Sequence, residues 1–116
     1  MSEHSEQCAL FEWARLATFQ YPELRYMFAI PNGGHRNKAT AMRLKEEGVQ
    51  PGVPDVFLPV PRGGFAGLWV EMKYGNNKPT EHQVRWLDWL EGQGFKTVVC
   101  WGWQVAKAEI ERYLAL

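Results

Sequence analysis

The sequence is short of the residues that build disulfide frameworks, zinc sites and membrane spans. Its 116 residues include two cysteines and three histidines, and no Cys-x-x-Cys pair occurs, so we expect neither a disulfide scaffold nor a structural zinc site. The longest apolar runs, such as residues 98–101, are far too short to span a bilayer. We expect Cys8 and Cys100 to be buried free thiols in a reducing cytoplasm.

The sequence also carries no net charge and few aspartates. Thirteen Lys and Arg residues balance thirteen Asp and Glu residues, which argues against bulk affinity for nucleic acid but allows a local basic patch between residues 36 and 45. Only Asp55 and Asp88 are aspartates, so they stand out among eleven glutamates. The polar, acidic first residues do not resemble a secretory signal, and we expect a cytoplasmic protein.

What the sequence does contain is enough apolar material for one core. Apolar residues make up 46% of it and aromatic residues 14%, an ordinary globular balance for one domain of residues 1–116. The patterns predict helices at residues 5–19, 38–47, 81–91 and 105–114 and strands at residues 26–30, 55–60, 67–74 and 96–101. The order α-β-α-β-β-α-β-α indicates an α/β fold with a single mixed β-sheet flanked by helices.

Two carboxylates and an ammonium are expected to meet at one end of a hairpin. Strands 55–60 and 67–74 are joined by the turn 61–64, so Asp55 should lie near Glu71 and Lys73, which share one face of their strand. Neighbouring carboxylates favour a cation between them, and hard oxygen ligands suit Mg²⁺ or Mn²⁺. A nearby lysine can orient water or stabilise charge on a scissile phosphate. The pattern therefore suits metal-assisted phosphodiester hydrolysis.

A purely structural interpretation of these residues is also open. Glu71 and Lys73 could form an exposed cross-strand pair of little energetic value, with Asp55 merely beginning a strand. The apolar residues 68–70 argue against this, because they predict a buried strand, where charged side chains are costly without a purpose.

At this point the chain resembles the PD-(D/E)xK nuclease superfamily, and more narrowly the small stand-alone VRR-NUC domains, many of them carried by bacteriophages. The resemblance rests on Pro54-Asp55, on Glu71-Met72-Lys73 and on the phrases at residues 28–36, 48–55 and 80–87. It extends over about residues 3–114, with no room for a second domain. It implies a restriction-endonuclease-like fold that is similar to that of archaeal junction resolvases.

The resemblance also implies roles for single residues. Asp55 and Glu71 would bind the divalent metal, with the backbone carbonyl of Met72 as a further ligand. Lys73 would be the catalytic lysine, and Gln83 would support the site from the next helix.

The family further places an acidic residue early in the first helix, and three glutamates are candidates. Glu3 ranks first as an additional metal ligand, because Gln7 follows at i+4 as in the family's Glu-x-x-x-Gln pattern. Glu6 ranks second. Glu12 is expected to face solvent.

Two other features have alternative interpretations. Gln83 follows Thr80 at the spacing of a capping box, so it could close the helix start, support the site, or do both. The Gly-rich turn at residues 32–36 could bind phosphate through backbone N–H groups and Arg36, with Lys38 as a further DNA contact, or it could be a plain turn.

As a whole, the resemblance implies an Mg²⁺- or Mn²⁺-dependent DNA endonuclease that acts on DNA structure, notably four-way (Holliday) junctions. Symmetric cutting of a junction needs two active sites, so we expect a homodimer. Its interface would come from the helix bearing Trp86 and Trp89 or from residues 101–103. A phage-encoded enzyme of this kind would act in the host cytoplasm.

Two alternatives belong to other functional classes. A non-catalytic DNA-binding or interaction module could keep this fold, although the intact Asp55, Glu71 and Lys73 argue against it. A restriction-type enzyme that reads bases would need a long inserted loop, and only residues 31–38 offer one.

Overall fold

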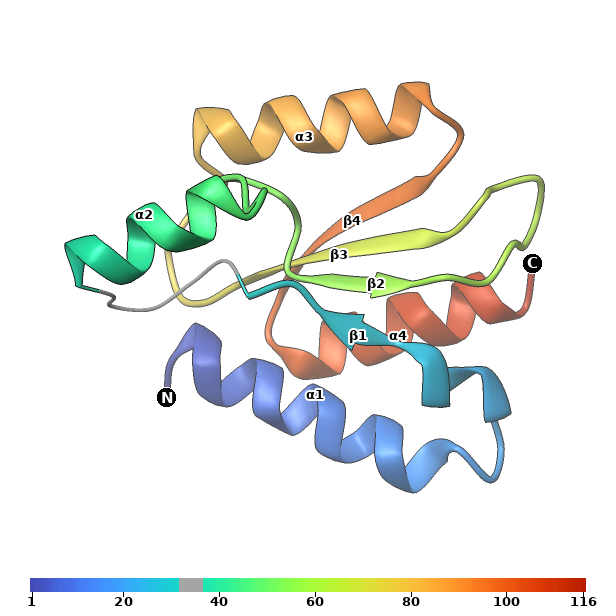
Figure 1. Cartoon of the computed structure of the whole chain (residues 1–116). Helices are drawn as coiled ribbons and strands as arrows, with labels where there is room; N and C mark the ends of the chain where they lie inside the picture. The colour runs from blue at the N-terminus through green and yellow to red at the C-terminus, as the bar shows by residue number, and fades with distance from the viewer. Residues whose placement is uncertain (32–36) are drawn as a thin grey trace.

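The computed structural model describes residues 1–31 and 37–116, and it consists of a four-stranded sheet between helices (Figure 1). In spatial order the strands are β1 (Phe28–Ala29), β2 (Val56–Leu58), β3 (Leu68–Lys73) and β4 (Lys96–Trp101). The helices are α1 (Glu3–Ala17), α2 (Lys38–Glu46), α3 (Glu81–Gly92) and α4 (Trp103–Leu114), and the short 3-10 helix η1 (Pro22–Tyr26) precedes β1.

The sheet is mixed, as the sequence predicts. Strands β1, β2 and β3 pair in antiparallel fashion, and β3 pairs with β4 in parallel. A parallel pair needs a long crossover, and α3 supplies it. In Figure 1, α1 and α4 cover one face of the sheet and α3 covers the other. The predicted α/β class with one mixed sheet is therefore confirmed.

The predicted hairpin between the second and third strands is confirmed, with a defined register. Val56 lies opposite Val70, so Asp55, one residue before β2, falls level with Glu71. Because side chains alternate along a strand, Val70 and Met72 point to one face of β3 and Glu71 and Lys73 to the other.

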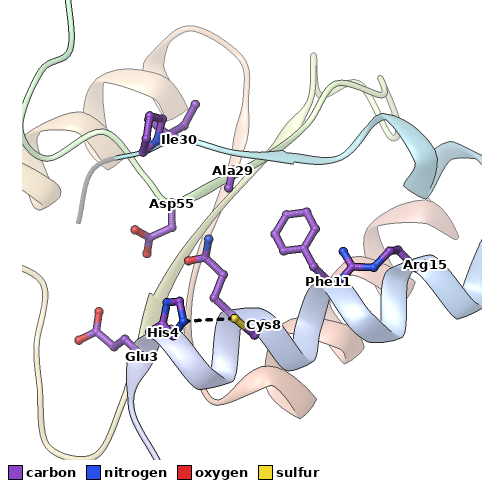
Figure 2. Close-up of a pocket in the computed structure, with 10 residues that line it drawn as sticks. Glu3, His4, Cys8, Phe11, Arg15, Ala29, Ile30 and Asp55 are labelled. Atoms are coloured by element: carbon purple, nitrogen blue, oxygen red, sulfur yellow. Dashed lines mark hydrogen bonds between the residues drawn. The ribbon is translucent and has the colours of Figure 1, made fainter. Parts of the chain in front are cut away.

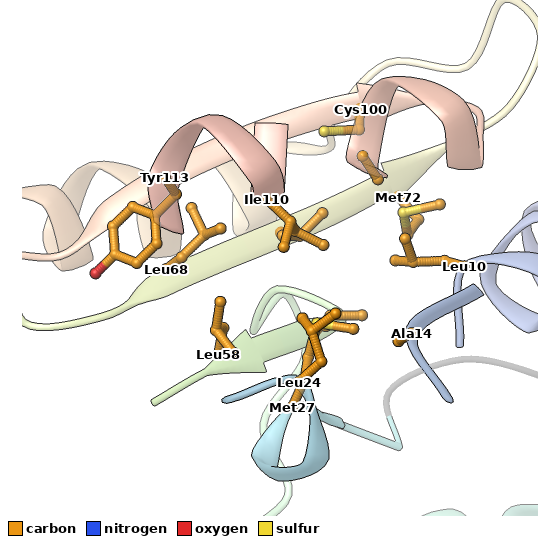
Figure 3. Packing of buried hydrophobic residues seen from close by; sticks show 13 residues of the cluster. Leu10, Ala14, Leu24, Met27, Leu58, Leu68, Met72, Cys100, Ile110 and Tyr113 are labelled. Atoms are coloured by element: carbon orange, nitrogen blue, oxygen red, sulfur yellow. The ribbon is translucent and has the colours of Figure 1, made fainter. Parts of the chain in front are cut away.

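The hydrophobic core fills the space between the sheet and the helices α1 and α4 (Figure 3). Alternate strand residues and helix residues three or four positions apart contribute to it. Its buried members on the strands and these two helices are Val56, Leu58, Leu68, Val70, Met72, Cys100, Leu10, Ala14, Ala106, Ile110 and Tyr113. The whole even-numbered face of β3 is thus used for packing against these helices, and the other face carries Trp69 followed by the charged Glu71 and Lys73.

Several predicted boundaries shift. The expected strand at residues 26–30 is reduced to two residues, because Pro22 begins η1 and its backbone continues as a 3-10 helix to Tyr26. Helix α4 begins at Trp103, two residues earlier than predicted. The predicted cap at Thr80 is confirmed, because its side chain accepts a hydrogen bond from the Gln83 N–H. The side chain of Asn37 caps α2 in the same way, by accepting a hydrogen bond from the Thr40 N–H.

The two thiols differ in burial. Cys100 is buried and free as expected, and burial raises its pKa to about 12. The prediction that Cys8 is buried is wrong, because Cys8 is exposed and lies 3.6 Å from the Nε2 atom of His4 one turn earlier. It lies on the side of α1 that lines a surface cavity, and the core face of that helix is formed by Leu10 and Ala14.

Across residues 1–31 and 37–116, no helix combines the length and the apolar character that a bilayer crossing requires.

Candidate active site

Asp55 is held in place at the start of β2 by contacts on both sides of it. Its Oδ2 atom accepts a hydrogen bond of 2.7 Å from the backbone N–H of Met72 on β3. The preceding loop packs directly against α3: Gly52 has φ +90°, and a Cβ atom there would lie 2.7 Å from the carbonyl carbon of His82. Only glycine fits at this position. The buried Pro54 follows, so the backbone that carries Asp55 has little freedom to move.

Glu71 and Lys73 are both buried at the far end of β3. Their exposed fractions are 1% and 5%, and Lys73 Nζ lies 3.5 Å from Glu71 Oε2. Within the described residues, neither carboxylate oxygen of Glu71 receives a well-formed hydrogen bond. The interpretation of this pair as an exposed surface ion pair is therefore wrong. A buried carboxylate that has an ion pair but no well-formed hydrogen bond is costly to maintain.

The cost of burying these carboxylates appears in their pKa values, which are raised. Burial, and after it the nearby charge of Asp55, raise the pKa of Glu71 from its ordinary value of 4.5 to about 8, against the opposing effect of Lys73. Burial also raises the pKa of Asp55, although the Met72 hydrogen bond works in the other direction. The charge of Glu3 adds to both upward shifts. Three carboxylates thus repel one another at this end of the sheet.

The structure separates the candidate glutamates of α1. Glu3 is at the site end of the helix, beside Asp55 (Figure 2), and its Oε2 atom accepts a hydrogen bond of 3.1 Å from Asn77 Nδ2. Glu6 is instead 6% exposed, and its Oε1 atom accepts a 2.9 Å hydrogen bond from the Trp103 N–H. It therefore caps α4. Glu12 is exposed, as predicted.

Gln83 has the position of a capping residue. Its Oε1 atom accepts a hydrogen bond of 2.8 Å from the Thr80 N–H, and its own N–H donates to Thr80 Oγ1. Both halves of the predicted capping box are present.

The predicted DNA contacts are placed only in part. Lys38 is exposed as the first residue of α2, a helix without any buried residue. Arg36 and the rest of the Gly-rich turn at residues 32–36 lie outside the described residues.

Sequence reasoning missed two supports of the site. The first is Asn77, which bonds Glu3 and whose own carbonyl accepts a 2.8 Å hydrogen bond from Trp101 Nε1. No local sequence pattern predicts either of these two hydrogen bonds of Asn77. The second is the capping role of Glu6, for which a signal exists: Gly102 occupies the N-cap position of α4 and has no side chain to cap it. A helix with such a start needs an acceptor from elsewhere.

A surface cavity of about 580 Å³ opens beside Asp55, between α1 and the residues that follow β1 (Figure 2). Among the described residues, no group of three or more His, Cys, Asp and Glu side chains is arranged to hold a metal. The candidate centre therefore rests on two carboxylates, Asp55 and Glu71, next to the ammonium of Lys73. Such a set can bind a hard divalent cation and stabilise negative charge.

Comparisons with known proteins identify the family and the fold. The VRR-NUC domain family matches residues 3–104 of the chain. A solved structure described as a VRR_NUC domain protein has 27% sequence identity and a TM-score of 0.86, over 100% of this chain and 90% of that one. A comparison with curated proteins gave no match. With its matched sequence and its mixed sheet, the chain belongs to the VRR-NUC family of nuclease domains.

Proposed function

We propose that this chain is a divalent-metal-dependent, structure-selective DNA endonuclease that resolves four-way (Holliday) junctions as a homodimer. The observation that carries the proposal is that the half-buried Asp55 meets the buried Glu71 and Lys73 at one end of β2 and β3, in a chain of a nuclease family. Residues 1–116 would act as one nuclease domain.

The residues present fit a hard divalent cation. Both oxygens of Glu71 are buried and accept no well-formed hydrogen bond in the described part of the chain, with only the Lys73 ammonium 3.5 Å from Oε2. Burial raises the pKa of both Asp55 and Glu71, and the charge of Asp55 adds to the rise at Glu71. Asp55 and Glu71 would hold Mg²⁺ or Mn²⁺, with the Met72 carbonyl and Glu3 as further oxygen ligands. A cation bound there would neutralise the carboxylates and polarise the scissile phosphate.

Lys73 supplies the remaining chemistry of the site. Its ammonium lies 3.5 Å from Glu71 Oε2, so it can stabilise negative charge that builds up on the phosphate and orient the attacking water. In the hydrolysis, the water oxygen bonds to phosphorus while the bond from phosphorus to the leaving sugar oxygen breaks. The attacking water gives up one proton and the leaving sugar oxygen takes up one, so the products are a phosphate monoester and a free hydroxyl group. Burial of Lys73 keeps bulk water from screening its charge.

The dimer is proposed from the aromatic surface and from the substrate. Trp89 and Trp101 are 58% and 43% exposed, and Trp86 packs edge to face against Trp89 with ring centroids 6.2 Å apart. Exposed tryptophans of this kind are typical of interfaces. A two-fold dimer would present two active sites to a junction that is itself roughly two-fold.

Removal of either carboxylate should abolish cleavage without loss of DNA binding. We expect Asp55→Asn and Glu71→Gln to lower the rate of junction cleavage in Mg²⁺ at least about 100-fold. Each change replaces a negatively charged metal ligand with a neutral amide of nearly the same shape. Binding to the same junction, measured by fluorescence anisotropy, should stay within about twofold of wild type. The matched control is Asp88→Asn on α3, the other aspartate, which is exposed and should cleave normally. Wild-type rates for Asp55→Asn or Glu71→Gln would contradict the metal site.

Removal of the lysine should separate catalysis from metal binding. We expect Lys73→Ala to cleave at least about 100-fold more slowly, the effect of losing one stabilising charge, yet to bind Mn²⁺ in calorimetric titrations. Lys96→Ala, at the opposite end of the sheet, should behave as wild type in both measurements. A folded Lys73→Ala protein that no longer binds Mn²⁺ would show that the role given to Lys73 is wrong.

The stability of the metal-free protein should depend on pH through Glu71. The pKa of this carboxyl is about 8 in the folded chain and 4.5 ordinarily, so between these values the folded state keeps a proton that the unfolded state has released. A pKa that is raised on folding stabilises the folded state at the acidic end of this window. In EDTA, the free energy of unfolding should therefore fall as pH rises from about 5 to about 8, by at least about 1.4 kcal/mol, the value of one pKa unit.

Two variants make this pH dependence specific. Glu71→Gln should flatten the fall, because the amide does not titrate. Glu12→Gln, the same change at an exposed position of α1, should leave it as in wild type. Urea unfolding at several pH values measures both, and an unchanged fall in Glu71→Gln would mean that another group is responsible.

Sedimentation tests the assembly. At micromolar concentration we expect the mass of two chains, and Trp89→Glu should shift the equilibrium toward one chain because it places a charge in an apolar interface. Phe19→Glu is the control, since Phe19 is 97% exposed and lies outside the proposed interface. A mass of one chain that does not rise with concentration would rule out the dimer.

A further inference from the structure

The cavity beside Asp55 continues away from the site along one stripe of α1. Glu3, Gln7, Phe11 and Arg15 line it and recur at four-residue intervals, which places them above one another on a helix. At about 1.5 Å per residue, the stripe extends about 18 Å from the candidate metal site. Figure 2 shows Glu3 and Asp55 at one end of it and Phe11 and Arg15 at the other.

The chemistry of the stripe changes along its length. Carboxylates occupy the site end, an amide follows at Gln7, and an aromatic ring and a guanidinium occupy the far end. Phe11 is only partly buried against the core, so part of its ring lines the cavity. Arg15 is exposed and forms no ion pair within residues 1–31 and 37–116. Its charge is therefore available to a ligand.

The opposite wall and the volume limit what can enter. Ala29 and Ile30 form part of the opposite wall and add apolar surface but no charge. A volume of about 580 Å³ lies within the range of small-molecule and cofactor sites, so the cavity has room for a nucleotide of a single strand. A flat aromatic ring, an amide and a free guanidinium are the groups that bind a base and its phosphate without regard to sequence.

We propose that this groove binds an unpaired DNA strand adjoining the scissile phosphate, with a base stacked on Phe11 and a phosphate bound by Arg15. The inference rests on the proposed nuclease function and specifies its substrate: DNA in which the strand to be cut separates from its complement next to the cut. A single-stranded flap provides such a strand, and a four-way junction provides one when the base pairs at its branch point open. An uninterrupted duplex provides none.

The first test is affinity for a single strand. A short fluorescent oligothymidylate is titrated with wild-type protein and variants in EDTA, so that no cleavage occurs. Arg15→Gln and Phe11→Leu should each weaken binding about five- to tenfold, as expected for the loss of one stacking or phosphate contact. Arg15→Lys should recover much of the affinity. Arg112→Gln is the control, because Arg112 is an exposed arginine on α4 outside the cavity.

The second test is cleavage, which separates this inference from the function on which it rests. With Mg²⁺ or Mn²⁺, wild type should cut a duplex carrying a single-stranded flap and a four-way junction faster than the fully paired duplex, and Arg15→Gln should lose that preference. If wild type cuts no DNA at all, the proposed function fails, while the oligothymidylate titration still decides whether the groove binds a strand. If folded Arg15→Gln and Phe11→Leu bind oligothymidylate as wild type does, or if wild type does not bind it, the groove has another role and the inference is overturned.

Discussion

The crowding of two carboxylates and one ammonium, Asp55, Glu71 and Lys73, at one end of β2 and β3 is the constraint on which the rest of the structure depends. Asp55 and Glu71 repel each other, and the single ammonium of Lys73 does not satisfy both carboxylates. A protein of this size has a net stability of only about 5–15 kcal/mol. The contacts around the cluster must therefore offset the free-energy cost of bringing these charges together. Each layer around the cluster contributes to holding it in one geometry.

The supports come from every part of the chain. The even-numbered face of β3 is fully packed against α1 and α4, which fixes the strand that carries Glu71 and Lys73. The Met72 N–H holds the Asp55 carboxylate, and Gly52 lets the preceding loop lie against the first turn of α3. Glu6 joins α1 to the start of α4, so Glu3, one turn earlier, keeps its place beside Asp55. The site and the core therefore share one set of packing contacts.

Local pattern was sufficient to predict the sheet and the meeting of the three charges. The turn at residues 61–64 and the two-residue alternation of β3 together define the register that brings Asp55 level with Glu71. The same reasoning failed for Cys8, because a helix with two partly apolar faces does not show from sequence which face meets the core. It also could not rank Glu3 above Glu6 from residues alone. Their difference depends on Asn77 and Trp103, which are distant in sequence and are brought close only by the fold.

The central claim is that Asp55 and Glu71 form the binding site of a divalent cation, and X-ray diffraction from crystals soaked in Mn²⁺ tests it most directly. Manganese scatters anomalously, so its position can be identified without assumptions about the ligands. We predict an anomalous difference peak between the carboxylates of Asp55 and Glu71, absent from crystals of Glu71→Gln soaked in the same way. A map without a peak at these carboxylates, or with manganese bound only elsewhere on the surface, would contradict the claim.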